Sequence, residues 1–395
     1  MEEWKEYKLG EVAIPVRDRI DTSVLDASSY ISTENMLPDK AGVTLSSGVP
    51  SSKAIQFKEG DILISNIRPY FKKIWRADKV GGCSADIICL RASKEVEPLF
   101  FYYLLSQDLF FNYVMQGAKG TKMPRGDRNQ IMQWPVSLPS KSEQQKIATI
   151  LSALDHKIEV NRRINDNLEK QAQALFKSWF VDFEPFKDGY FEESELGMIP
   201  KGWKAGSLED ITTQKSERVG DRDDVKVLSP VTTGQLMLSE EFFTKQVFSE
   251  SIAKYKVVEI GDFAYNPARV NIGSLGRNNY DFDGCVSPVY VVFSCKDGYV
   301  HLFDLYRKTE KFKTEVNLRA IGGVRQSLNY KDFAFIQCII PPLHVVEKFN
   351  AIYDHLLVMQ KHTEEENDRL ASIRDTLLPR LMSGELKVNE IENVI

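Results

Sequence analysis

Basic and amide side chains that could contact nucleic acid gather in two segments of the N-terminal half. Residues 119–128 carry four positive charges and one negative charge, with glycines that keep the backbone open. Residues 66–76 combine basic and amide side chains with aromatic ones. Arg, Asn and Gln can bind base edges bidentately, while Lys and loop amides suit phosphates. We therefore predict nucleic-acid contacts from Asn66, Arg68, Lys72, Lys73, Arg76, Lys119, Lys122, Arg125 and Arg128.

The C-terminal half contains comparable segments made of different residues. Its candidate contacts are Asn266, Arg269, Asn271, Arg277, Asn278, Arg319, Arg325, Ser327 and Asn329. Solvated polar loops are the alternative explanation, and the net charge of −5 argues against a nucleic-acid surface that covers the whole chain. The recurrence of such loops in both halves favours two related surfaces with different ligands.

Motifs of catalysis are missing. The sequence contains no phosphate-binding loop of the Gly-x-x-x-x-Gly-Lys type, no Gly-x-Ser-x-Gly elbow and no His-Glu-x-x-His helix. Residues 266–269, Asn-Pro-Ala-Arg, lack the second proline and the aromatic residue of an amino-methyltransferase tetrad. The five cysteines form no Cys-x-x-Cys pair, so we expect buried thiols and no metal site. These absences favour a protein that binds over one that catalyses.

A long helix is expected to position the first set of loops. From Ser142 to Phe180, mostly apolar residues recur in alternating steps of four and three, which is the 3.5-residue period of a coiled coil. Ser140 and Glu143 have the spacing of a capping box at its start. The predicted seam is Ile147, Leu151, Leu154, Ile158, Asn161, Asn165, Leu168, Ala172, Leu175 and Trp179. Its two central asparagines should fix register and partner choice.

A second helix with the same period is the expected partner. Its predicted seam is Val345, Phe349, Ile352, Leu356, Met359, Thr363, Glu366, Leu370, Ile373 and Leu377. Many of these residues match the first seam at an offset of 202, and the middle is again polar at Thr363 and Glu366. The two polar midsections would face each other if the helices run antiparallel.

The repeat extends through the whole chain. Trp4 matches Trp203, and Cys83 matches Cys285, at nearly constant offsets. We therefore predict an α+β protein with two tandem globular domains and two long helices that pair with each other. Residues 97–115 and 300–316 are expected to be helical within these domains. The predicted segments are a first domain over 1–141, a helix over 142–180, a linker over 181–199, a second domain over 200–342, a helix over 343–384 and a tail over 385–395.

Composition is typical of a globular, soluble protein. Hydrophobic residues make up 43% of the chain and charged residues 27%. No apolar run reaches the roughly 18 residues that a membrane span needs, and the N-terminus does not have the form of a signal peptide. A cytoplasmic protein without a membrane partner is therefore expected.

Four motifs resemble those of the specificity subunits of type I restriction–modification systems, and the resemblance covers nearly the whole chain. They lie at 138–147, 175–183, 200–203 and 377–386. The resemblance implies two target-recognition domains that each read one half of a bipartite double-stranded DNA site. It also implies that the two long helices separate these domains as an antiparallel coiled coil, which sets the spacing and docks two methyltransferase subunits. Restriction–translocase subunits would complete the enzyme, and S-adenosylmethionine, ATP and magnesium would be bound by the partners, with no cofactor in this chain.

Two other interpretations stay open at this stage. A purely structural coiled-coil scaffold could carry globular units that bind protein or sugar, and an enzyme could have a site without a known motif. The second helix also departs from the family pattern, because it begins with Val345-Val346-Glu347 where the first has Glu143-Gln144-Gln145.

Overall fold

The computed structural model describes residues 4–242, 251–320 and 327–392. It divides into two compact units. Unit 1 comprises Met1–Arg162 with Glu364–Ile395, and unit 2 comprises Arg163–Thr363. Each unit contains small sheets, short helices and a stretch of both long helices, so the predicted α+β class is confirmed.

Unit 1 is built on two four-stranded sheets and a strand pair. The first sheet has the order β2-β9-β6-β7 and the second β3-β5-β8-β4, while β1 pairs with β10. The strands are β1 (Lys5–Lys8), β2 (Ala13–Pro15), β3 (Arg19–Asp21), β4 (Tyr30–Ile31), β5 (Lys53–Phe57), β6 (Ile62–Ser65), β7 (Ile74–Arg76), β8 (Gly81–Cys83), β9 (Ile87–Ala92) and β10 (Pro135–Leu138). The four residues of β6 are all buried because the strand is central in its sheet.

Unit 2 repeats this arrangement. Its first sheet has the order β14-β21-β18-β19, its second contains β17-β20-β15, which corresponds to β5-β8-β4, and β13 pairs with β22. The edge strands of the second sheet differ, with β3 beside β5 in unit 1 and β16 beside β15 in unit 2. The strands are β13 (Lys204–Ser207), β14 (Thr212–Lys215), β15 (Lys226–Pro230), β16 (Leu236–Leu238), β17 (Lys256–Val258), β18 (Phe263–Tyr265), β19 (Leu275–Arg277), β20 (Gly284–Val286), β21 (Val291–Cys295) and β22 (Gln337–Ile340).

One parallel strand pair in each unit shows the repeat most directly. Ile31 pairs with Cys83 between β4 and β8, and Val227 pairs with Cys285 between β15 and β20. The other strand pairs are antiparallel. Shared strand order and a shared exception indicate duplication of one domain, as the sequence predicted.

The helices predicted over 97–115 and 300–316 are each broken in two, which the sequence did not predict. Gln107 has extended backbone angles, so it ends one helix and precedes the next. Thr309 does the same in unit 2, and its hydroxyl accepts a hydrogen bond from the backbone of Phe312. The short helices are α1 (Leu9–Val12), α2 (Pro98–Leu105), α3 (Asp108–Gln116) and α4 (Arg128–Ile131) in unit 1, and α6 (Ser239–Phe242), α7 (Val300–Tyr306), α8 (Glu310–Arg319) and α9 (Tyr330–Ala334) in unit 2.

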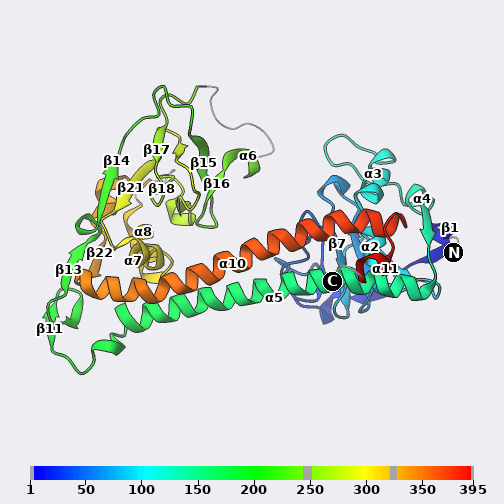
Figure 1. Cartoon of the computed structure of the whole chain (residues 1–395), viewed down its shortest axis with the longest axis horizontal. Helices are drawn as coiled ribbons and strands as arrows, with labels where there is room; N and C mark the ends of the chain where they lie inside the picture. Colours follow the sequence, from blue (N-terminus) through cyan, green and yellow to red (C-terminus); the bar gives the residue numbers. More distant parts are fainter. Residues whose placement is uncertain (1–3, 243–250, 321–326, 393–395) are drawn as a thin grey trace. The chain divides into compact units, whose positions relative to one another are not determined.

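The two long helices are α5 (Lys141–Phe180) and α10 (Leu343–Met382), each of 40 residues (Figure 1). At 1.5 Å per residue each is about 60 Å long. In unit 1 the first part of α5 contacts the last part of α10, because Asp155 Oδ1 lies 2.8 Å from Arg374 Nη1. In unit 2 the end of α5 packs against the start of α10 through Trp179, Phe180 and Phe349. The helices therefore pair antiparallel, as predicted.

All ten positions of the predicted seam on α5 are buried or half-buried. Of the ten positions predicted for the α10 seam, seven are buried or half-buried and three are exposed. Ile352 is 44% exposed and Ile373 is 42% exposed, while Tyr353 is buried and Arg374 faces Asp155. The observed seam comprises Val345, Val346, Phe349, Tyr353, Leu356, Gln360, Thr363, Glu366, Asn367, Leu370, Arg374, Leu377 and Leu381.

The error on α10 has a physical cause. Seam residues on a helix can be spaced four and then three apart, or three and then four apart, and both series repeat every 3.5 residues on average. Two such series on α10 can therefore share every second residue and differ at the others. Apolar residues at Ile352, Met359 and Ile373 favoured the wrong pattern. Contacts with α5 decide between the two patterns, and they select Asn367 and Arg374.

The polar midsections face each other as expected. In unit 1, Asn161 is buried and donates to Glu366 Oε2 at 2.7 Å and to Asn367 Oδ1 at 3.0 Å. In unit 2, the Thr363 hydroxyl donates to the side chain of Asn165. The two asparagine contacts are equivalent under the offset of 202, so the polar layer follows the internal repeat and fixes the helix register.

The expected linker and tail both contain regular structure. After α5, a 3₁₀ turn (η3, Glu184–Phe186) leads into the hairpin of β11 (Phe191–Ser194) and β12 (Gly197–Pro200). Phe183 and Phe186 make edge-to-face contacts with Trp203 there. Near the end of the chain, Val388 of α11 (Val388–Glu392) is buried in the core of unit 1.

Candidate nucleic-acid interface

In unit 1 the two basic segments predicted from the sequence lie together. The loop after β6 and the loop before α4 form a bridge between Ile67 and Arg125. Arg68 donates its backbone N–H to Pro124 O at 2.8 Å, and Gly126 donates to Asn66 O at 3.3 Å. Loops about 60 residues apart in the sequence therefore form one surface.

Unit 2 brings its corresponding loops together in the same way. The loop after β18 begins at Asn266, and Leu328, just before α9, donates its backbone N–H to Pro267 O at 3.0 Å. Arg269 and Ser327 are exposed on these loops. Arg325, also predicted as a contact, lies outside the described residues. The same junction thus recurs with different side chains.

Several exposed cations of unit 1 are held only by weak surface ion pairs. Arg125 Nη2 lies 3.2 Å from Asp86 Oδ1, and Lys119 Nζ lies 3.3 Å from Asp127 Oδ2. The pKa of Asp127 is lowered, chiefly because its carboxylate accepts hydrogen bonds from the α4 backbone. Exposed ion pairs contribute little stability, so these cations can exchange a carboxylate for a phosphate at small cost. Lys122 is also exposed.

Other predicted contacts are engaged in structural hydrogen bonds. Arg128 Nη2 donates to Ala85 O at 2.6 Å. Lys73 Nζ donates to Thr33 O at 2.8 Å, and partial burial lowers its pKa. Arg319 pairs with Glu315 on its own helix, and Asn329 caps α9 through the backbone of Asp332. These side chains hold the loops in place, a role that composition alone does not reveal.

Asn278 is the clearest correction among the predicted contacts. It is 1% exposed, and its amide donates to the backbone oxygens of Val258, Glu259 and Phe282. A buried amide with three backbone acceptors cannot reach a base edge. The sequence showed only an asparagine in a polar loop and could not distinguish these two roles.

Replacing Asn278 with alanine should therefore destabilise unit 2 without changing what it binds. Leaving three carbonyls without this donor is expected to cost roughly 1–3 kcal/mol. Chemical denaturation of the full chain would measure the loss. If Asn278→Ala changed sequence preference at unaltered stability, the structural role assigned here would be wrong.

Lys40 belongs to this surface and was missed by the sequence analysis. Its Nζ lies 3.2 Å from Asp108 Oδ1, and Lys72 Nζ lies 2.9 Å from Asp108 Oδ2. The hydrogen bond from Lys72 is the main reason that the pKa of Asp108 is lowered. Lys40 lies in a turn 32 residues before Lys72, and no pattern in the sequence links the two.

Three predicted arginines have hydrogen-bonding capacity that the protein does not fill. The Nε atoms of Arg68, Arg76 and Arg277 are buried and have no hydrogen-bond partner among the described residues. Arg76 ends β7 and Arg277 ends the corresponding strand β19. Buried donors are normally paired, so these positions are candidates for contact with a ligand.

Among the described residues, no group of three or more His, Cys, Asp or Glu side chains could hold a metal ion. Their five cysteines are free, four of them buried and Cys295 half-buried. Within the same residues, no helix is long and apolar enough to cross a membrane.

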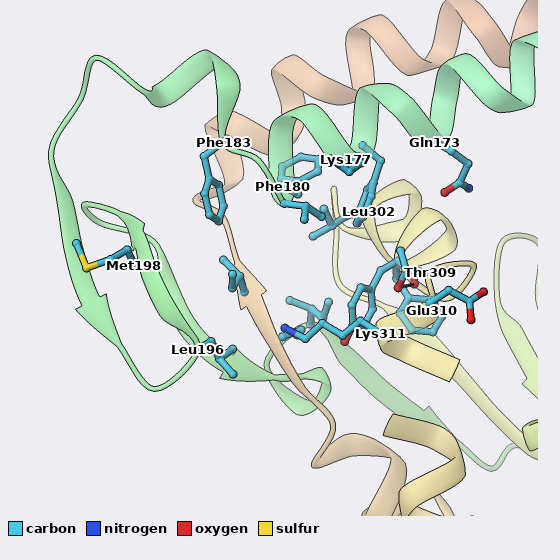
Figure 2. Close-up of a pocket in the computed structure, with 17 residues that line it drawn as sticks. Gln173, Lys177, Phe180, Phe183, Leu196, Met198, Leu302, Thr309, Glu310 and Lys311 are labelled. Carbon is cyan, nitrogen blue, oxygen red and sulfur yellow. Dashed lines mark hydrogen bonds between the residues drawn. The ribbon is translucent and has the colours of Figure 1, made fainter. Parts of the chain in front are cut away.

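A cavity of about 760 Å³ in unit 2 is lined mainly by apolar side chains, unlike the basic loops described above (Figure 2). Phe180 and Phe183, at and after the end of α5, line it together with Leu302 of α7 and Met198 of β12. Lys177, which also lines it, is paired with Asp182. Because this lining is mainly apolar and presents no cluster of cations to phosphates, the cavity is not part of the candidate nucleic-acid interface.

Comparison with known proteins agrees with this description. The family described as type I restriction modification DNA specificity domain matches residues 1–170. The HindI specificity subunit of Haemophilus influenzae is 25% identical over 98% of this chain and 100% of its own length. The MjaIX specificity subunit of Methanocaldococcus jannaschii is 29% identical over 74% of this chain and 70% of its own.

A solved structure shows that the fold is shared as well. The S subunit of a type I restriction–modification system from M. genitalium aligns with 96% of each chain at a TM-score of 0.53 and 16% identity. The profile match, the relatives and this fold agree with the motifs in the sequence. Over nearly its whole length the chain is similar to the specificity subunits of type I restriction–modification systems.

Proposed function

We propose that units 1 and 2 each read one half of a bipartite DNA site through their joined loops. The observation that carries this proposal is the recurrence of one loop junction with different side chains. Asn66 O accepts from the Gly126 N–H in unit 1, and Pro267 O accepts from the Leu328 N–H in unit 2. A conserved scaffold with divergent contact residues is what two different half-sites require.

The chain itself would have no catalytic role. Methylation, translocation and cleavage would be carried out by two methyltransferase subunits and by restriction subunits, which would bind S-adenosylmethionine, ATP and magnesium. The joined loops supply cations, amides and backbone donors, which are groups that bind DNA and position it. In this scheme the paired helices set the distance between half-sites, as subunit geometry does in dimeric repressors.

Exposed apolar side chains on α10 support docking of a partner. Ile352, Val358 and Met359 are exposed in unit 2, and Ile373 is exposed in unit 1. These residues are not used in the pairing with α5. Ile352 and Met359 lie seven residues apart, so they share one face of the helix, and exposed apolar side chains that adjoin one another mark interaction surfaces.

A gel-retention assay with the full chain and its methyltransferase partner tests the proposal. We expect retention of duplex genomic fragments that contain the target, in the presence of excess non-specific competitor. A scaffold that binds protein or sugar would assemble with the partner and retain no DNA. That result would reject the DNA-reading role while leaving the fold unchanged.

The double variant Lys122→Ala, Arg125→Ala should weaken DNA binding while partner assembly survives. Each lost phosphate contact is expected to reduce the slope of log affinity against log salt by about 0.9. The control is Lys58→Ala with Lys79→Ala, which removes the same charge from exposed positions at the opposite end of β6 and β7. Unchanged affinity and slope in the first variant would exclude this loop from the DNA surface.

A further inference from the structure

Unit 2 contains a second cavity, of about 690 Å³, beside the loop that follows β18. It lies between the turn 231–235, a 3₁₀ turn (η5, Val270–Ile272) and helices α7 and α8. Side chains that decide its chemistry are Gln235, Asn271, Arg277, Asn279, Asp304, Arg307, Lys308 and Lys313. Its volume lies within the range of small-molecule sites.

Unit 1 has lysines beside the equivalent 3₁₀ turn, where they line a smaller pocket of about 300 Å³. Lys72 follows the 3₁₀ turn η2 (Pro69–Phe71) at φ 50°, and both Lys72 and Lys40 reach Asp108, the first residue of α3. In unit 2, Gly273 follows η5 at φ 95° and Gly234 lies in the turn at φ 82°. Left-handed backbone favours glycine, so unit 1 holds Lys40 and Lys72 against this preference, whereas unit 2 has glycines without side chains there.

The open cavity has an apolar floor and a cationic rim. Val270, Leu275, Phe312 and Val316 line it and are buried. Four cationic side chains line it, against the single carboxylate of Asp304. This combination suits a ligand with one flat apolar part and one anionic part.

The four cations differ in how firmly they are engaged. Arg307 is fixed, because it pairs with Asp304 at 2.7 Å and donates to Gly234 O and Leu275 O. Lys308 pairs with Glu169 at 2.9 Å, and Lys313 pairs with Glu310 at 2.6 Å, both at partly exposed positions where such pairs are weak. The Arg277 side chain differs, because its buried Nε has no hydrogen-bond partner among the described residues. Arg277 and Lys313 are thus available to an anion.

We propose that this cavity binds a nucleoside phosphate. The base would lie on the apolar floor, the amides of Gln235, Asn271 and Asn279 would contact its edge, and the phosphate would bind Arg277 and Lys313. The nucleotide can be free or can belong to a DNA strand. Only the second case rests on the proposed DNA-reading function.

Titration of the full chain with a fluorescent N-methylanthraniloyl derivative of AMP tests the site. We expect saturable binding that weakens about tenfold or more in Arg277→Gln and in Lys313→Gln, because each removes a charge-assisted hydrogen bond. Lys311→Gln is the control, since Lys311 is exposed on the same helix and does not line this cavity. Lys313 is also exposed, so its variant should fold normally even if Arg277→Gln does not.

Competition identifies the source of the nucleotide. Displacement by a short single-stranded DNA at lower concentration than by AMP assigns the site to a nucleotide of a DNA strand, and displacement by AMP alone assigns it to a free nucleotide. No saturable binding, or equal displacement by inorganic phosphate, would overturn the proposal. DNA retention measured on the same variants keeps the two proposals separate, because intact retention together with absent nucleotide binding rejects only this site.

Discussion

Lengthening both long helices by one heptad is expected to lengthen the unread gap of the DNA site by about three base pairs. Seven residues add about 10 Å to a helix, and duplex DNA rises about 3.4 Å per base pair. A heptad preserves the seam because it equals two periods of 3.5 residues. If the helices set the spacing, the half-site sequences should stay the same, since no loop is altered.

The structure shows where the insertion belongs. In α5 it should follow Arg162, and in α10 it should follow Thr363, at the boundary between the two units. The contact of Asn161 with Asn367 then stays within unit 1, and that of Thr363 with Asn165 stays within unit 2. Both register-fixing contacts are therefore kept.

Methylation mapping in cells that carry the variant measures the gap directly. Three base pairs also turn the duplex by nearly a third of a turn, so bending or twisting must absorb some mismatch, and a shift of two or four pairs is compatible with the prediction. Insertion in α5 alone is the control, since it breaks the register and should abolish modification. An active enzyme that still marks the original spacing would show that the helices do not set it.

The variant Leu168→Asp should separate the helices and abolish docking of the methyltransferase. Leu168 is 4% exposed on the α5 seam. Loss of its side-chain burial together with an uncompensated charge is expected to cost roughly 3–5 kcal/mol. Losses of this size are a large fraction of the stability of an ordinary domain.

A matched control lies one turn earlier on the same helix. Ile164 is 37% exposed, so Ile164→Asp introduces the same charge where water can solvate it. Analytical ultracentrifugation of each variant mixed with the methyltransferase would compare assembly. Equal assembly of the Leu168 variant and the unaltered chain would contradict the proposed pairing.

The sequence by itself determined the duplication and the two long helices, and it indicated that these helices pair with each other. These features rest on periodicity and on ordered matches such as Trp4 with Trp203, which depend only on residue type and spacing. The α5 seam was predictable for the same reason, because its apolar positions follow a single pattern. The basic segments of unit 1 were identified from composition, and the structure brings them together.

Tertiary contacts alone decided which residues of these segments pair the helices, which lie on the basic surface and which hold the fold together. Tyr353 and Arg374 replace Ile352 and Ile373 on the α10 seam because the partner helix selects between two patterns of equal period. Lys40 joins Lys72 at Asp108 through a turn that no local pattern links to it. Asn278 is fixed by the backbone of three other residues, so its amide serves the fold. Residue type gives a side chain its chemistry, but the neighbours that fold against it determine whether that chemistry is available to a ligand.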